Sequence, residues 1–207
     1  MCIIFSRFPR PGRCKTRLID AVGPQGAARL QRVMTEGMLA AARELARQRP
    51  GLRVELHVAG AGPAEIREWL GQDQPWRRQE GQNLGERLSH SFLHGFQAGF
   101  APIIVTASDC PRLDAATLAL ALDGLANHDV VLGPSLDGGY YLLGLRAPQE
   151  RLFSEIEWGR SGVLAATRKR IAAAALSCLE LPPLPDIDRP ADMELLPLEI
   201  RNRAAGP

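Results

Sequence analysis

Residues 2–18 read CIIFSRFPRPGRCKTRL, an apolar run that passes straight into a loop with two prolines. A short apolar run that ends at a Pro/Gly turn predicts a buried first strand over residues 2–6. A glycine followed by Lys-Thr just after a strand suggests a loop that holds phosphate. We therefore expect Lys15 and Arg17 to project above the edge of a sheet.

This loop is not a Walker A loop. That motif requires GxxxxGK[ST], and its two glycine positions are occupied by Pro9 and Cys14. The turn through Pro11 and Gly12 is instead stiff, and Lys15 stands in a chain that otherwise uses arginine for its positive charge. A compact ammonium suits contact with phosphate as a point charge. An ordinary basic surface turn is the alternative.

Strands and helices alternate along the rest of the chain. Apolar or alternating runs predict strands over residues 53–59, 102–111, 129–134, 138–145 and 176–182. Helical spacing predicts helices over residues 24–48, 63–70, 84–100, 114–126, 161–175 and 191–200. This order predicts a three-layer α/β/α sandwich with a mostly parallel mixed sheet, in a single domain over residues 1–207.

The composition excludes several classes of protein. The net charge of +2 is too small for nucleic acid or an anionic membrane to be the main partner. The apolar start is too short for a signal peptide, and we expect no membrane span. The four cysteines have no metal-binding spacing, so we expect reduced thiols in a cytoplasmic protein. Residues 202–207 are expected to form a frayed tail.

Four loops follow predicted strands at the edge where such sheets collect ligands, namely residues 7–17, 108–111, 134–139 and 186–190. In the second loop, Asp109 ends an apolar strand and is a suitable ligand for Mg²⁺ or Mn²⁺, which prefer oxygen donors. One carboxylate rarely holds such an ion, and Asp186 or Asp188 can supply the partner. Asp before Pro is also a common turn, which is the alternative for this loop.

Two further segments contain candidate binding residues. Asp137, Gly138 and Gly139 allow a tight turn that a ligand can approach closely, although a plain hairpin is equally compatible with Asp-Gly. Gly81 and Gly85 flank a predicted helix start, which can receive a base, a ribose or a phosphate. Tyr140 and Tyr141 follow the first of these turns and can pack on a ligand. Glu86, His90 and His94 share one face of a predicted helix. Because the zinc motif HExxH is absent, a solvated or pocket-lining face is favoured over a zinc site. No Ser/His/Asp or Cys/His arrangement for nucleophilic catalysis is apparent in the sequence.

Taken together, these segments resemble the nucleotide-diphospho-sugar transferase superfamily with the GT-A fold. Within it the chain is similar to the radical-SAM/selenodomain-associated transferase family, and parts resemble guanylyltransferases of the phospholactate and molybdenum-cofactor type and cytidylyltransferases. The segments that carry the resemblance are IIFSRFPRPGRCKTRL, QEGQNLGERL, VTASDCPRL, GPSLDGGYYLLGL, LFSEIEWGRSGVL and LPDIDRPADMELL. SDCP departs from the DxD of many glycosyltransferases, and Arg7 stands where a lysine is expected.

The resemblance implies a role for each candidate residue. The first loop and the helix start would bind the nucleotide, through Pro11, Gly12, Lys15, Arg17, Gly81 and Gly85. The cation, Mg²⁺ or Mn²⁺, would be held by Asp109 and Asp188. The sugar or acceptor would lie against Asp137, Gly138, Gly139, Tyr140 and Trp158, and the residues assigned to catalysis are Lys15, Asp109 and Asp137.

The expected activity is therefore transfer from a nucleotide-linked substrate to a small-molecule acceptor. Glycosyl transfer from a nucleotide-diphospho-sugar is slightly favoured. A nucleotidylyltransferase that releases pyrophosphate is the first alternative, because a basic loop suits pyrophosphate. A nucleotide-sugar-binding protein without turnover is the second, because fold does not fix function.

Overall fold

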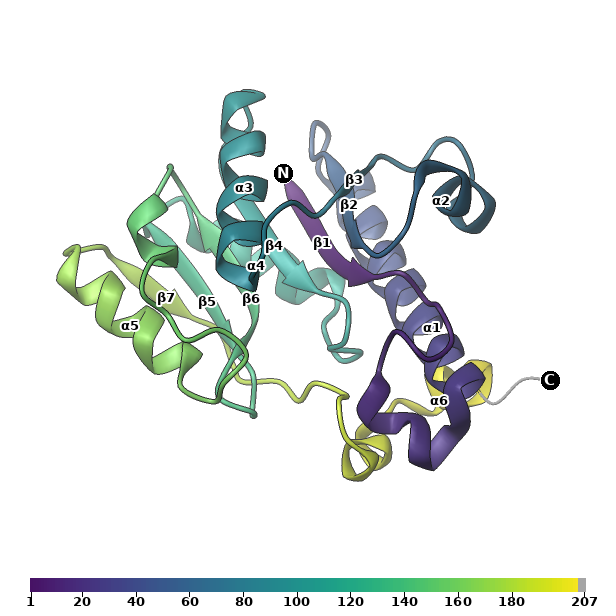
Figure 1. The fold of residues 1–207 in the computed structure, drawn as a ribbon. Helices are drawn as coiled ribbons and strands as arrows, with labels where there is room; N and C mark the ends of the chain where they lie inside the picture. The colour runs from purple at the N-terminus through teal and green to yellow at the C-terminus, as the bar shows by residue number, and fades with distance from the viewer. Residues whose placement is uncertain (205–207) are drawn as a thin grey trace.

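The computed structural model describes residues 1–204, in which seven strands form one sheet (Figure 1). The spatial order of the strands is β3-β2-β1-β4-β6-β5-β7. Their bounds are β1 Cys2–Arg7, β2 Val54–Ala59, β3 Trp76–Arg78, β4 Ile103–Ala107, β5 Val130–Pro134, β6 Tyr140–Leu145 and β7 Cys178–Glu180. The predicted α/β sandwich with a mostly parallel mixed sheet is confirmed.

The direction of the strands decides where ligands can bind. β6 runs antiparallel to both of its neighbours, β4 and β5, and every other neighbouring pair is parallel. β6 is reversed because a short hairpin turn, residues 135–139, connects it to β5. The other six strands therefore end at the same edge of the sheet, and the four loops expected to carry the site follow strands at that edge.

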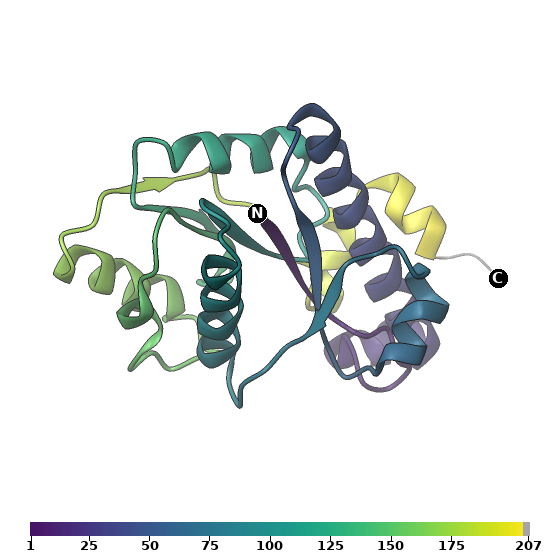
Figure 2. The same ribbon diagram turned by 90° about the horizontal axis from the view of Figure 1, so that it is seen from above.

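Helices cover both faces of the sheet (Figure 2). Their bounds are α1 Ile19–Gln48, α2 Pro63–Leu70, α3 Leu84–Gln97, α4 Ala115–Gly124, α5 Val163–Ala173 and α6 Leu198–Ala204. Successive side chains of β1 point to opposite faces, so Cys2 and Ile4 pack in the core with α1, α2 and α4. Ile3 and Phe5 pack in a second core with α3 and α5.

A third apolar cluster joins the end of the chain to its beginning. Leu18, Leu30 and Met34 pack against Ile187 and Leu196, and α6 lies against α1. The five side chains are at most 5% exposed. This cluster fixes the segment around Ile187 beside the loop that follows β1.

Several element boundaries differ from those predicted. The long helix begins at Ile19, but Gly23 (φ 71°, ψ 166°) breaks it, so its regular part starts at Pro24 as expected. β4 ends at Ala107, which leaves Asp109 in a loop instead of in the strand. The strand β3 was not predicted, because three residues are too few to show alternation.

The C-terminal region also differs. In place of one helix over residues 191–200, a 3₁₀ turn covers Pro190–Leu195 and α6 follows it. Pro197, which has no N–H to donate, stands between the two. Residues 202–204 complete α6 and are not a frayed tail, and residues 205–207 of that expected tail lie outside the described residues.

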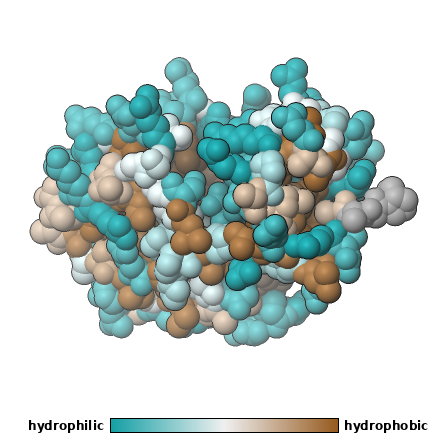
Figure 3. All heavy atoms as spheres, turned by 90° about the horizontal axis from the view of Figure 1, so that it is seen from below, coloured by the Kyte–Doolittle hydropathy of each residue, from teal (hydrophilic) through white to brown (hydrophobic). Residues whose placement is uncertain are grey.

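The outer surface presents both polar and apolar side chains. On the face drawn in Figure 3, apolar residues are scattered among polar ones. No helix within residues 1–204 is long and apolar enough to cross a membrane. All four cysteines are free thiols, and Cys2, Cys14 and Cys110 are buried.

Candidate functional site

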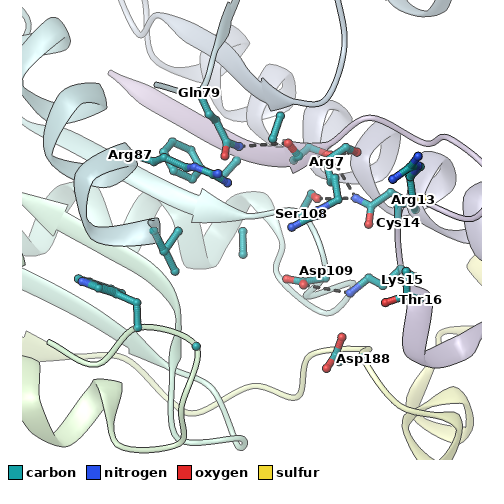
Figure 4. Close-up of a pocket in the computed structure, with 18 of the residues that line it drawn as sticks. Arg7, Arg13, Cys14, Lys15, Thr16, Gln79, Arg87, Ser108, Asp109 and Asp188 are labelled. Atoms are coloured by element: carbon teal, nitrogen blue, oxygen red, sulfur yellow. Dashed lines mark hydrogen bonds and ion pairs between the residues drawn. The ribbon is translucent and has the colours of Figure 1, made fainter. Parts of the chain in front are cut away.

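A cleft of about 650 Å³ opens at the carboxyl ends of β1, β2 and β4 (Figure 4). Its floor is made by the last residues of these strands, including Phe5, Ser6, Ala59 and Ala107. Ligands of open α/β sheets bind at this edge because the connecting loops diverge there.

The side chains that line the cleft are predominantly basic. Five cations face two carboxylates, namely Arg7, Arg13, Lys15, Arg17 and Arg87 against Asp109 and Asp188. The excess of three positive charges in the cleft exceeds the net charge of +2 of the whole chain. Such a cleft favours a ligand with several negative charges.

Lys15 is the most constrained of these cations. Its backbone is left-handed (φ 45°), which is unusual for a residue other than glycine and is typical of functional positions. The side chain is only 5% exposed. Its Nζ atom donates to Asp109 Oδ2 at 3.0 Å and to the Ile187 carbonyl at 2.5 Å. Lys15 therefore connects three of the four loops that the sequence placed at the site.

Backbone contacts bring the two predicted metal ligands to the same cleft. The N–H of Ile187 donates to the Asp109 carbonyl at 3.0 Å. The Cys110 thiol donates to the Pro185 carbonyl at 3.1 Å. Asp188 then lies across the cleft from Asp109 and forms an ion pair with Arg17. Each carboxylate is thus already paired with a basic side chain of the first loop.

The pair Asp109 and Asp188 suits a divalent cation by donor type but offers only two side chains. No group of three or more His, Cys, Asp or Glu side chains that could hold a metal occurs within the described chain. Mg²⁺ commonly takes one or two carboxylates and completes its shell with substrate phosphates and water. The residues therefore fit a cation that arrives with a phosphorylated substrate.

Asp186 stands near the same carboxylates. Burial, together with the charges of Asp137 and Asp109, raises the pKa of Asp186 from 3.8 to about 6. Asp137 belongs to the 135–139 hairpin, so this turn approaches the 186–188 segment. The turn itself does not line the cleft.

Replacing Asp186 with asparagine is expected to stabilise the metal-free protein at neutral pH. Folding raises the pKa of Asp186, so the folded protein holds the proton of this carboxyl more tightly than the unfolded chain does. The resulting stabilisation is complete below the pKa of the unfolded chain, near 4, and it is lost as the pH rises through about 6. We expect Asp186→Asn to raise the free energy of unfolding by about 1 kcal/mol at pH 7, after discounting for solvent, and to leave it unchanged near pH 4.

The measurement is urea unfolding in the presence of a chelator at both pH values, with the exposed Asp73→Asn as the control. An equal effect of Asp186→Asn on the free energy of unfolding at pH 4 and pH 7 would contradict the raised pKa of Asp186.

The predicted substrate turn has the geometry of a hairpin. Asp137 Oδ1 accepts from the Gly139 N–H at 2.9 Å and from the Ser135 hydroxyl. Gly138 is left-handed (φ 91°), and a Cβ there would lie 2.1 Å from the Ser161 carbonyl oxygen. Tyr140 packs in the core with α5, and its buried hydroxyl has no partner within the described residues. Among these residues, Asp137 alone is placed near the site carboxylates.

The start of α3 forms the opposite wall of the cleft. Asn83 caps the helix by accepting from the Glu86 N–H at 3.0 Å. A Cβ at Gly85 would lie 2.2 Å from Trp158 Nε1, so the glycine allows the indole to reach the cleft. Trp158, which was predicted to contact the sugar or acceptor, lines this cleft. Gly81 and Gly85 belong to this wall but do not line the cleft.

Two residues of the first loop lie apart from the cleft. Pro11 lines a separate hollow with Phe8 and Trp69. Gly12 (φ 74°) lines neither, and its role is to turn the chain toward Lys15.

Several residues that line the cleft were not singled out from the sequence. Arg13 and Arg87 gave no signal because arginine is common throughout this chain, and Arg7 was noted only as a departure. Gln79 and Ser108 are single polar residues at the ends of strands. Their positions follow from the topology of the sheet and not from a local pattern.

The histidines near α3 differ in exposure: His57 is buried, His94 is half-buried and His90 is exposed. His90 contacts the Glu80 carbonyl, while Glu86 is used in the cap of α3. His94 and His57 lie beside Glu55. His90 and His94 line a small pocket together with His57.

A Ser–His–Glu chain does occur, although the sequence showed none. His57 contacts Ser91 Oγ at 2.7 Å through Nδ1 and Glu55 Oε1 at 3.3 Å through Nε2. All three residues are less than 9% exposed, so they form a buried polar network between β2 and α3.

Comparisons with known proteins agree with this architecture. The family model described as "Uncharacterized protein conserved in bacteria (DUF2064)" matches residues 40–160. The crystal structure of a "putative nucleotide-diphospho-sugar transferase" from Desulfovibrio desulfuricans G20 superposes with a TM-score of 0.84 at 31% identity. That alignment covers 91% of this chain and 81% of the other. No curated protein matches the sequence.

More distant structures share the fold alone. The manganese complex of Rv0371c from Mycobacterium tuberculosis H37Rv has a TM-score of 0.54 at 14% identity, covering 98% of this chain and 96% of that one. A cytidylyltransferase from Leptospira borgpetersenii serovar Hardjo-bovis has a TM-score of 0.55 at 15% identity, covering 87% and 74%.

Proposed function

The chain belongs to the DUF2064 family, and we propose that it is a metal-dependent transferase that binds a nucleotide-linked substrate through its phosphates. The relative that is 31% identical to it is described as a "putative nucleotide-diphospho-sugar transferase", which supports the transferase class. The observation that carries the proposal is the basic cleft at the carboxyl ends of β1, β2 and β4, with Asp109 bound to Lys15.

In this proposal the first loop exchanges its partners when substrate binds. Lys15 and Arg17 leave Asp109 and Asp188 and contact phosphate oxygens, because the phosphate brings the negative charge they require. The two carboxylates are then free to hold Mg²⁺ or Mn²⁺. When bound, the cation would stabilise the negative charge that develops on the leaving phosphate. Asp137 would lie toward the acceptor.

Glycosyl transfer from a nucleotide-diphospho-sugar is the leading reaction. The bond between the anomeric carbon and the phosphate oxygen breaks, the acceptor oxygen bonds to that carbon, and a nucleoside diphosphate leaves. The description of the relative from Desulfovibrio supports this assignment.

Nucleotidylyl transfer is the second candidate, and the number of cations in the cleft favours it. In that reaction the acceptor attacks the α-phosphorus of a nucleoside triphosphate and pyrophosphate leaves. Five basic side chains match a triphosphate better than a diphosphate. Distant structures with this fold include cytidylyltransferases.

The remaining expectations belong to the same proposal. They are a single domain over residues 1–207, a cytoplasmic location consistent with four free thiols, and a place in the radical-SAM/selenodomain-associated family. A binding protein without turnover would have no need for both Asp109 and Asp188 in the cleft.

A thermal-shift screen tests the proposal. We expect nucleoside triphosphates or nucleotide-diphospho-sugars to raise the melting temperature in the presence of Mn²⁺, because a ligand of the folded state adds stability by mass action. A response to the sugar nucleotides alone supports glycosyl transfer, and a response to triphosphates supports nucleotidylyl transfer. The absence of any shift with either class, with and without Mn²⁺, would overturn the proposal.

A further inference from the structure

The two ends of the cleft are lined by different side chains. Arg13 and Lys15 lie at the end formed by the first loop, whereas Gln79 and Arg87 lie at the opposite end (Figure 4). Leu84 and Trp158 also line the cleft, and both belong to the wall at the start of α3. A flat apolar surface beside a few polar groups is the environment that suits a nucleobase.

The side chain of Gln79 is held in one orientation. Its Nε2 atom donates to the Ser6 carbonyl at 3.1 Å and to the His57 carbonyl at 2.8 Å. A backbone carbonyl can only accept, so both N–H bonds of the amide must face the sheet. The remaining atom, Oε1, is therefore fixed as an acceptor, and it accepts no hydrogen bond from the described residues. In Figure 4 it lies on the side of the amide nearer to Arg87.

Two other side chains of this wall, Asn83 and Glu86, have their acceptor atoms in hydrogen bonds. Asn83 Oδ1 accepts from the Glu86 N–H at 3.0 Å. The two carboxylate oxygens of Glu86 accept from Asn83 Nδ2 at 2.7 Å and from the Gln82 N–H at 2.8 Å. Arg87 donates through Nε to the Gly81 carbonyl at 3.0 Å, which holds its guanidinium beside the wall.

We propose that Gln79 determines the base of the nucleotide, with Oε1 accepting a hydrogen bond from an exocyclic amino group. The inference rests on the proposed function, because it assumes that the phosphates lie at the Lys15 end. A base with a carbonyl at that position would place its oxygen against Gln79 Oε1, so that two acceptors would face each other. The Gln79 amide cannot rotate to donate instead, because both of its N–H bonds face the sheet. A site built in this way rejects the analogue that lacks the donor.

Nucleoside diphosphates are the appropriate probes, because nucleotide-sugars and nucleoside triphosphates both contain them. The pairs CDP/UDP and ADP/IDP exchange an amino group for a carbonyl, and GDP/IDP differ by one amino group. In calorimetric titrations with Mn²⁺, we expect the amino-bearing member of at least one pair to bind tenfold or more tightly. A preference below tenfold in all three pairs overturns the inference.

The variant Gln79→Met separates recognition from folding. It removes the fixed acceptor and keeps the length of the side chain, so we expect the preference within the pair to fall below threefold. The control is Gln74→Met, at a buried glutamine that also donates to a backbone carbonyl, that of Pro75 at 2.7 Å, outside the cleft. We expect this control to keep the wild-type preference. A general loosening of the fold would weaken both nucleotides of a pair and leave their ratio intact.

The outcomes distinguish the two proposals. If nucleotides bind without an amino preference, or if Gln79→Met keeps the preference, the role of Gln79 is wrong and the transferase proposal stands. If no nucleotide binds, the proposed function fails, and the inference fails with it.

Discussion

Replacing Asp109 with asparagine is expected to lower turnover by about 100-fold or more and to abolish the effect of Mn²⁺ on nucleotide binding. The amide oxygen of asparagine can still accept the hydrogen bond from Lys15 Nζ, which lies 3.0 Å from Asp109 in the native protein. The variant thus keeps the hydrogen bond with Lys15 but loses the negative charge that would hold the cation. Calorimetric titration of nucleotide with and without Mn²⁺ measures the second effect independently of turnover.

The choice of asparagine matters because Lys15 is buried. In Asp109→Ala the ammonium, only 5% exposed, would lose its charge partner, and breaking a buried pair is strongly destabilising. Asp123→Asn is the matched control, since Asp123 pairs with Arg49 at 2.6 Å outside the cleft. Binding that still responds to Mn²⁺ in Asp109→Asn would remove Asp109 from the metal site.

Replacing Ile187 with alanine is expected to lower the free energy of unfolding by about 2–4 kcal/mol. Ile187 is fully buried in the cluster with Leu18 and Met34, and its truncation leaves a cavity where the chain end meets α1. The backbone of Ile187 also donates to the Asp109 carbonyl and accepts from Lys15. We therefore expect weaker nucleotide binding in the same variant, because these contacts position the site. Denaturant unfolding and calorimetric titration measure the two effects.

Leu196→Ala provides the comparison for this variant. Leu196 belongs to the same cluster and is 5% exposed, but its backbone donates to Met193 and not to the segments of the cleft. We expect a similar loss of stability without a loss of nucleotide affinity. A loss below about 1 kcal/mol in Ile187→Ala would show that the cluster does not fix the 186–188 segment.

The sequence was sufficient to predict the layers of the fold. Apolar runs such as IIV at 103–105 read as strands because strands buried on both faces are continuously hydrophobic. Asp114, the first residue of the helix predicted over residues 114–126, caps that helix, because its side chain accepts from the Thr117 N–H at 2.8 Å. The edge strand β3 was missed because WRR has neither an apolar run nor alternation. Pairing with β2 is what makes it a strand.

Residues of the cleft could be predicted where they directly follow a strand in the sequence. They could not be predicted where their position depends on contacts between distant parts of the chain. Lys15, Asp109 and Asp188 were found because each stands in a loop after a predicted strand, and the structure places all three at one cleft. Tyr140, which was expected beside the substrate, packs against the core on the α5 side, and its contact with a ligand stays a prediction. The orientation of Gln79 could not be foreseen, since it depends on carbonyls 22 and 73 residues away in the chain.

The concentration of positive charge in the cleft also bears on how quickly a ligand arrives. The whole chain has a net charge of only +2, so the five cations at one sheet edge dominate the field that an approaching anion meets. Such a field guides diffusional encounters and raises association rates at low ionic strength. Salt screens this attraction within a Debye length of about 8 Å at physiological ionic strength. The same side chains that would hold a polyanion in place thus also speed its capture from dilute solution.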